Sequence, residues 1–267
     1  MEKTDYCEIA KQKMQYFNYS PRTTEIYVHY INRFLGYYRN IAPTKLTAEN
    51  FQAYLNEYQF TSRSRQNQVI NAIKFLYEKV LDRKYGKVCF TRPRSEKHLP
   101  QVIDNKYLIE KISAIQNRKH KAILSLAYSV ALRVSEVINM KITDIDSKRM
   151  VITIRQAKGR KDRIVPLSEN LLSILRDYVR EYRPKEYLFN GQGKPQYSAE
   201  SCNQLVKQYI GEQYHFHLLR HSTATELLER GVDMSIIQKL LGHNNIKTTQ
   251  IYAQISTTKL QSIPLPI

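Results

Sequence analysis

Apolar residues recur with helical spacing along the first third of the chain. One predicted helix follows Ser20, a suitable N-cap, and Pro21, which suits a first helical turn. The apolar residues on one of its faces are Tyr27, Tyr30, Ile31, Phe34 and Leu35. Similar stripes predict one helix from Thr47 and another from Ser62 or Ser64. Their apolar positions are Phe51, Tyr54, Leu55, Val69, Ala72, Ile73, Leu76 and Val80. The pattern predicts an N-terminal bundle of about four helices.

The pattern is interrupted over residues 82–100, DRKYGKVCFTRPRSEKHLP, which are basic and hold two prolines without a clear period. Such a segment is typical of an interdomain linker. We therefore expect a helical domain over residues 1–92, a linker over 93–100 and a second domain over 101–267.

The second domain is predicted to be mostly helical with a small antiparallel sheet. A short helix is expected at 106–116, an apolar helical stretch at 120–140, and further helices at 171–182, 199–210, 217–230 and 235–241. Between them, residues 150–156 and 163–167 are rich in β-branched side chains and flank the polar segment AKGRKD. This arrangement predicts a β-hairpin with a basic tip.

The charge balance points to a polyanion as partner. Lys and Arg number 42 against 24 Asp and Glu, which gives a net charge of +18 and an isoelectric point near 9.7. Residues 1–92 hold 15 basic and 8 acidic residues, so the excess is not confined to one tail. Nucleic acid is the first candidate partner, an anionic membrane surface the second, and a merely soluble basic protein the plain alternative.

Other features of the composition narrow the class. The three cysteines are widely spaced without zinc-ligand spacing, so we expect reduced thiols in a cytoplasmic protein. No apolar signal region and no stretch of about 20 apolar residues is present. No P-loop and no acidic cluster for paired Mg²⁺ ions stands out, and we expect neither a metal nor another cofactor.

Four local groups of residues are candidates for chemistry. The first is Arg133 with Glu136 three residues later. The guanidinium suits a phosphate, but taken alone this pair is more simply interpreted as an ion pair at a helix junction. Ser135 is a candidate cap for the helix that follows. The second is the hairpin tip with Lys158, Arg160 and Lys161, where bases can reach a DNA groove or simply form a solvated turn.

The third and fourth groups lie near the C-terminus. His217 and Arg220 share a helix face at i, i+3, although such a pair is common; His221 points elsewhere and is expected to be structural. Gly242 ends a helix before His243, and Tyr252 follows nine residues after this histidine. With 20 tyrosines in the chain, only these surroundings single out Tyr252.

Taken together and in this order, these groups resemble the tyrosine recombinase, or phage integrase, family, including its Xer-type members. The matching stretches are ALRVSEV, QAKGRKDRIVPL, HLLRHSTATELLERG and LLGHNNIKTTQIY. The resemblance is strong over about residues 100–255, and the N-terminal helices resemble the SAM-like core-binding domain of that family. It implies a C-terminal catalytic domain with the DNA breaking-rejoining enzyme fold.

The resemblance implies a site-specific recombinase that cleaves and rejoins DNA through a 3′-phosphotyrosyl intermediate, without metal or ATP. Tyr252 would be the nucleophile, Lys158 the acid for the leaving 5′-oxygen, and His217 the base. The phosphate would be bound by Arg133, Arg220 and His243, with Glu136 as a support for Arg133 and with Arg160 and Lys161 as DNA-binding residues. A free tyrosine titrates near ~10, so this chemistry needs a base or a positive field beside it.

Alternatives within the fold are a relaxing topoisomerase of the type IB kind and a DNA-binding regulator without catalysis. The resemblance also implies double-stranded DNA as partner and a homo-tetramer on paired sites, with a monomer off DNA. Leu260, Ile263 and Leu265 could dock the C-terminal tail on a neighbouring protomer.

Overall fold

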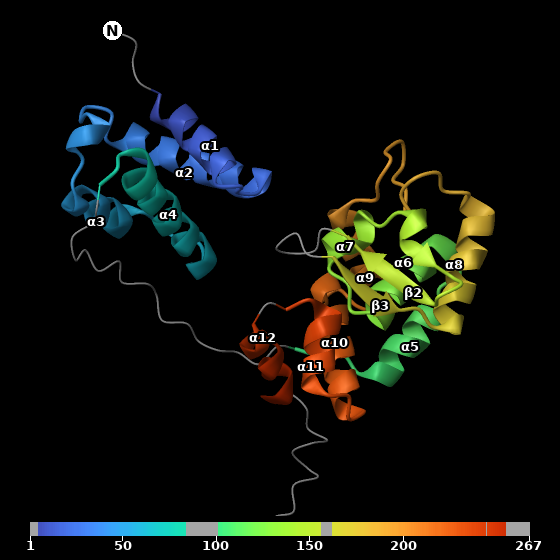
Figure 1. Ribbon diagram of the computed structural model, residues 1–267. Helices are drawn as coiled ribbons and strands as arrows, with labels where there is room; N and C mark the ends of the chain where they lie inside the picture. Colours follow the sequence, from blue (N-terminus) through green and yellow to red (C-terminus); the bar gives the residue numbers. More distant parts are fainter. Residues whose placement is uncertain (1–4, 84–100, 156–161, 244, 255–267) are drawn as a thin grey trace, which may run out of the picture. The chain divides into compact units, whose positions relative to one another are not determined.

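The computed structural model describes residues 5–83, 101–155, 162–243 and 245–254. The chain forms two compact units, Met1–Glu96 and Lys97–Ile267, which Figure 1 shows. The predicted linker at 93–100 lies outside the described residues. Within those residues, no helix has the length and apolar character that crossing a bilayer requires.

Four α-helices build the N-terminal unit: α1 (Tyr6–Tyr16), α2 (Pro21–Tyr37), α3 (Ala48–Glu57) and α4 (Arg63–Phe75). The apolar stripes predicted the last three, within a bundle of about four helices, but gave no range for α1. A 3-10 turn (Pro43–Lys45) precedes α3, and a π turn (Leu76–Val80) extends α4. The side chains of Ser20, Thr47 and Ser62 accept backbone N–H groups at the starts of α2, α3 and α4. These caps satisfy donors that have no partner inside the helix, and Ser62 rather than Ser64 begins α4.

The core of this unit is formed by the predicted apolar faces. Tyr30, Ile31 and Phe34 of α2 are buried, and Tyr27 and Leu35 pack at the margin. The ring of Phe34 makes edge-to-face contacts with aromatic rings of α3, an arrangement that favours their quadrupoles.

The C-terminal unit combines eight α-helices of the described residues with a three-stranded antiparallel sheet. The helices are α5 (Asn105–Ser113), α6 (Arg118–Ser129), α7 (Val134–Ile138), α8 (Glu169–Tyr182), α9 (Ala199–Tyr209), α10 (Phe216–Glu229), α11 (Met234–Leu241) and α12 (Ile246–Gln250). Short 3-10 turns lie at Ile142–Asp144 and Ile251–Gln254. The sheet has the order β1 (Ile145–Asp146), β2 (Val151–Ile154), β3 (Arg163–Pro166). Ile152 pairs with Val165, which confirms the predicted hairpin; β1 was not predicted.

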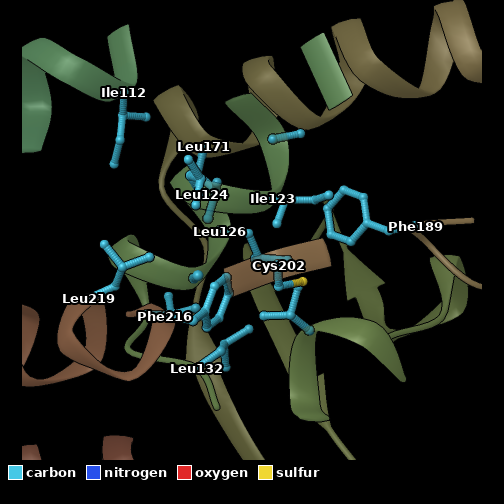
Figure 2. Packing of buried hydrophobic residues seen from close by; sticks show 14 of the residues in the cluster. Ile112, Ile123, Leu124, Leu126, Leu132, Leu171, Phe189, Cys202, Phe216 and Leu219 are labelled. Atoms are coloured by element: carbon cyan, nitrogen blue, oxygen red, sulfur yellow. The ribbon is translucent and has the colours of Figure 1, made fainter. Parts of the chain in front are cut away.

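Helices α6, α9 and α10 contribute to one apolar core, seen from close by in Figure 2. Phe216 opens α10 and lies beside Cys202 of α9 and Leu132 in the turn after α6. Burial raises the pKa of the Cys202 thiol to about 12, so this cysteine behaves as an apolar core residue.

The apolar stretch at 120–140 holds two helices, α6 and α7, which meet at the helix junction expected beside Arg133. Helix α6 ends at Ser129, and Ala131 adopts a left-handed backbone with φ of 54°. The N–H of Leu132 then donates to the carbonyl of Ala127 at 3.1 Å, which satisfies a carbonyl at the end of α6. The cap of α7 is Arg133 with Glu136, and Ser135 lies inside α7, contrary to the cap expected from the sequence.

Candidate active site

Glu136 is the centre of an ion-pair cluster at the start of α7. Its carboxylate accepts a hydrogen bond from the backbone N–H of Arg133 at 2.9 Å and from Nη1 of the same residue at 2.8 Å. Both carboxylate oxygens also accept from Arg163 of β3, each at 2.8 Å. A carboxylate between two arginines holds both guanidinium groups in defined positions.

Three successive carbonyls at the end of α11 each accept from a different arginine. Leu240 accepts from Nε of Arg163 at 2.8 Å, Leu241 accepts from Nη2 of Arg220 at 2.6 Å, and Gly242 accepts from Nη2 of Arg133 at 3.4 Å. The last carbonyls of a helix have no partner inside it and carry the negative end of its dipole. The end of α11 therefore gathers three cations in one place.

Arg220 has the largest side chain among those that are almost fully buried, with 1% exposed. Its Nη1 donates to the carbonyl of Ala131 at 2.6 Å, and this carbonyl belongs to the left-handed turn after α6. Burial and the neighbouring Arg133 lower the pKa of Arg220 to about 10. The guanidinium still carries its charge at neutral pH, in surroundings where charge acts strongly.

The hydroxyl of Tyr252 is paired with His221. Tyr252 lies in the 3-10 turn after α12, is 2% exposed and packs in a small apolar cluster with Ala131, Ala224 and Leu241. Its Oη lies 3.0 Å from Nδ1 of His221. Burial raises the pKa of Tyr252, and Arg220 acts against that rise. The phenol is therefore protonated and shares a hydrogen bond with the imidazole.

Two further histidines surround this pair. The ring of His217 meets that of His221 edge to face, with centroids 4.6 Å apart, one turn apart on α10. The ring of His243 stacks with that of Tyr252 at 6.4 Å, and its Nδ1 lies 2.9 Å from Oγ1 of Thr249. Burial, followed by the charge of Arg220, lowers the pKa of both His217 and His243, the latter to about 4.

The structure brings together most of the residues singled out in the sequence. Arg133, Glu136, His217, Arg220, His243 and Tyr252 are connected through the contacts above. Lys158, Arg160 and Lys161 lie outside the described residues.

Two contacts were missed or misjudged from the sequence. His221 was expected to point elsewhere, yet it binds the hydroxyl of Tyr252; its spacing of four residues from His217 was the available signal. Arg163 was predicted only as part of a strand. Its position after the basic hairpin tip did not indicate its ion pair with Glu136.

This arrangement combines fixed positive charge with a phenol beside neutral imidazoles. Guanidinium groups match the geometry of a phosphate, and a protonated phenol needs a base or a positive field before it attacks. The site is therefore suited to nucleophilic attack on an anionic ester.

Protonation of His221 should cost stability at mildly acidic pH. Burial, the neighbouring His217 and Arg220 lower the pKa of His221 from 6.5 to about 4. Because the unfolded chain binds this proton below pH 6.5 and the folded chain does not until about pH 4, stability falls over that interval. We expect the loss of unfolding free energy between pH 7.5 and pH 5 in urea titrations to be smaller by about 2 kcal/mol in His221→Leu. An equal loss in both proteins would contradict this assignment.

Two family profiles match the sequence. The profile of the phage integrase family matches residues 101–259, and that of the N-terminal SAM-like domain of phage integrases matches residues 7–87. The chain is 36% identical over 252 residues to the tyrosine recombinase XerA of Pyrococcus horikoshii, which covers 91% of this chain and 86% of that protein. It is 33% identical to the XerA of Pyrococcus furiosus, over 97% of this chain and 94% of that protein.

Solved structures share the architecture. A crystal structure of XerA recombinase aligns with a TM-score of 0.55 and 28% identity, over 97% of this chain and 98% of that chain. The XerH site-specific recombinase bound to its difH substrate aligns with a TM-score of 0.70 over 96% of this chain and 82% of that chain. At 20% identity the second likeness concerns the fold alone.

Proposed function

Because this chain belongs to the phage integrase family and is a site-specific tyrosine recombinase, we propose that Tyr252 is the residue that becomes covalently joined to DNA. One observation carries this assignment. The hydroxyl of Tyr252 lies 3.0 Å from the half-buried His221 of α10, the helix that also supplies the buried Arg220. A tyrosine on the surface would have neither the histidine partner nor the positive field of Arg220.

In the proposed reaction, Oη of Tyr252 attacks the phosphorus of the scissile phosphodiester. A bond between this oxygen and phosphorus forms, the bond to the 5′-oxygen breaks, and the DNA is left with a 3′-phosphotyrosyl link and a free 5′-hydroxyl. Attack by a 5′-hydroxyl of another strand reverses the step at a new junction. The phosphoester bond is conserved, so this exchange needs no ATP.

We propose the following roles for the residues around the scissile phosphate. Arg133 and Arg220 bind the non-bridging oxygens and stabilise the charge of the transition state, while His243 donates a hydrogen bond to the same phosphate. Lys158 protonates the leaving 5′-oxygen. His217 serves as the base, and His221 holds the hydroxyl of Tyr252 until a phosphate occupies the site. Glu136 orients Arg133.

The partner of the chain is DNA. Double-stranded DNA would be bound by residues 1–92 as core-binding domain and by residues 101–267 as catalytic domain, joined by a linker at 93–100. Arg160 and Lys161 would contact the DNA beside the scissile phosphate. The XerH structure is of a recombinase bound to its substrate DNA, which supports this partner.

We place the reaction in the cytoplasm, in a homo-tetramer on two paired sites, with a monomer off DNA. Exchange between two duplexes requires four cleavages, which is the reason for four protomers. Leu260, Ile263 and Leu265 of the proposed docking tail lie outside the described residues.

Covalent trapping tests the proposed chemistry. The full chain is incubated with nicked suicide duplexes drawn from the DNA that flanks its gene, after a binding assay has identified a bound duplex. We expect a protein–DNA adduct that resists denaturation, and peptide mapping should place the nucleotide on Tyr252. An adduct on another residue, or no adduct on DNA that is bound, would overturn the proposal.

A further inference from the structure

Arg163 is the most fully paired of the three arginines at the end of α11. Its side chain is 9% exposed, and all three of its guanidinium nitrogens donate to protein acceptors: two to Glu136 and one to the carbonyl of Leu240. The side chain of Arg133 is 19% exposed and makes one close bond to the same carboxylate. Of these two arginines, Arg133 is therefore the one that a ligand can reach.

One carboxylate serves both cations, and it does so unequally. Arg163 engages both oxygens of Glu136 in a fork, whereas the guanidinium of Arg133 reaches only Oε1, through a single nitrogen. Forked pairs between guanidinium and carboxylate are stronger than single contacts. Arg163 thus neutralises most of the negative charge of Glu136. The carboxylate therefore offsets less of the positive charge of Arg133.

We propose that Arg163 is a positioning residue that takes up the charge of Glu136, so that Arg133 keeps its charge and its remaining N–H groups for the DNA phosphate. This inference rests on the proposed role of Arg133 as a phosphate ligand. Arg163 itself touches no substrate; it acts through Glu136 and through the end of α11.

The turn after α11 is shaped to accommodate Arg163. Gly242 has φ of 61°, and a Cβ atom added there would lie 3.1 Å from Cδ of Arg163. The glycine thus permits both the left-handed turn and the close approach of this side chain. The same turn leads directly to His243, so Arg163 also holds the backbone in front of a second proposed phosphate ligand.

Removing Arg163 should redirect Glu136 toward Arg133. Glu136 has a side chain that is only 4% exposed, so water cannot readily replace the lost partner. In Arg163→Met the carboxylate would form a fork with Arg133 and cancel its charge. We expect the single-turnover rate of suicide-substrate cleavage to fall about 100-fold.

A second substitution distinguishes this electrostatic role from simple structural support. Glu136→Gln in the Arg163→Met background removes the charge that captures Arg133 and leaves an amide oxygen to receive its hydrogen bond. The double variant should therefore cleave roughly tenfold faster than Arg163→Met alone. A purely structural role predicts that the double variant is no faster, and that result would overturn the proposal.

A neutral substrate provides an independent test. A methylphosphonate at the scissile position lacks one negative oxygen, so it depends less on the charge of Arg133. The ratio of wild-type to Arg163→Met rates should shrink on this substrate. An equal ratio on both substrates would count against the inference.

Should Arg163→Met fail to fold, Arg163→Lys provides a second variant. It keeps a cation near Glu136 without the fork and should show a smaller defect of the same kind.

Arg118→Met is the matched control, because Arg118 pairs with Glu181 at 2.9 Å between α6 and α8, away from the site. It should cleave at the wild-type rate.

Arg133→Ala distinguishes the role of Arg133 from that of Arg163. If Arg133→Ala cleaves normally, the proposed role of Arg133 fails; if it is inactive while Arg163→Met is normal, only the present inference fails.

Discussion

Replacing Tyr252 with phenylalanine is expected to abolish the covalent adduct with DNA while leaving DNA binding unchanged. The substitution removes one oxygen, which is both the proposed nucleophile and the hydrogen-bond partner of His221. The fold should tolerate it, because loss of one hydrogen bond of this kind costs about 1 kcal/mol. The measurement is the adduct yield on suicide duplexes at saturating protein, alongside a binding titration.

Tyr209→Phe provides a control of the same chemical type. Tyr209 also pairs with a histidine, since its hydroxyl lies 2.9 Å from Nδ1 of His120. This variant loses an equivalent hydrogen bond in the same unit and should form the adduct at the wild-type rate. If Tyr252→Phe still formed an adduct, another residue would be the nucleophile.

Arg220→Lys should have the second largest effect. Lysine keeps the positive charge but offers a point charge in place of a planar fork, so it cannot serve the carbonyls of Ala131 and Leu241 together with a phosphate. Loss of one such donor to a transition state lowers rates by about 10²–10³-fold, and we expect a decrease of that size in single-turnover cleavage.

The thermal midpoint of Arg220→Lys should also fall, because one of two buried carbonyls loses its partner. Affinity for DNA should change far less than the cleavage rate, since many other phosphate contacts contribute to binding. Cleavage within about threefold of the wild type would contradict the proposed role of Arg220 at the phosphate, given the magnitude expected for such a donor.

Both effects depend on a site that the sequence describes only in part. Caps and apolar stripes identified the N-terminal helices because a helix start and a helix face depend on residues three or four positions apart. The β-hairpin was evident because its strands are neighbours in sequence. For the same reason Arg133 and Glu136, three residues apart, were recognisable as a pair from their spacing alone.

Local patterns mislead where a contact elsewhere in the chain overrides them. The apolar run across α6 continues past Ser129, yet the helix ends there because Ala131 takes a left-handed conformation. No glycine signals this turn. Its carbonyl is held by Arg220, which is 89 residues distant in the chain, and the buried hydrogen bond helps to stabilise a conformation that alanine rarely adopts.

The sequence by itself determined the order of elements, the basic character that suits DNA, and the identity of the residues resembling a recombinase site. Only the tertiary structure decided which of them touch. Arg163 meets Glu136 across 27 residues and Tyr252 meets His221 across 31, because α10, the end of α11 and the turn before α7 pack together. Sequence spacing encodes neighbours within one helix or hairpin, whereas these contacts arise from the packing of elements that are distant in the chain.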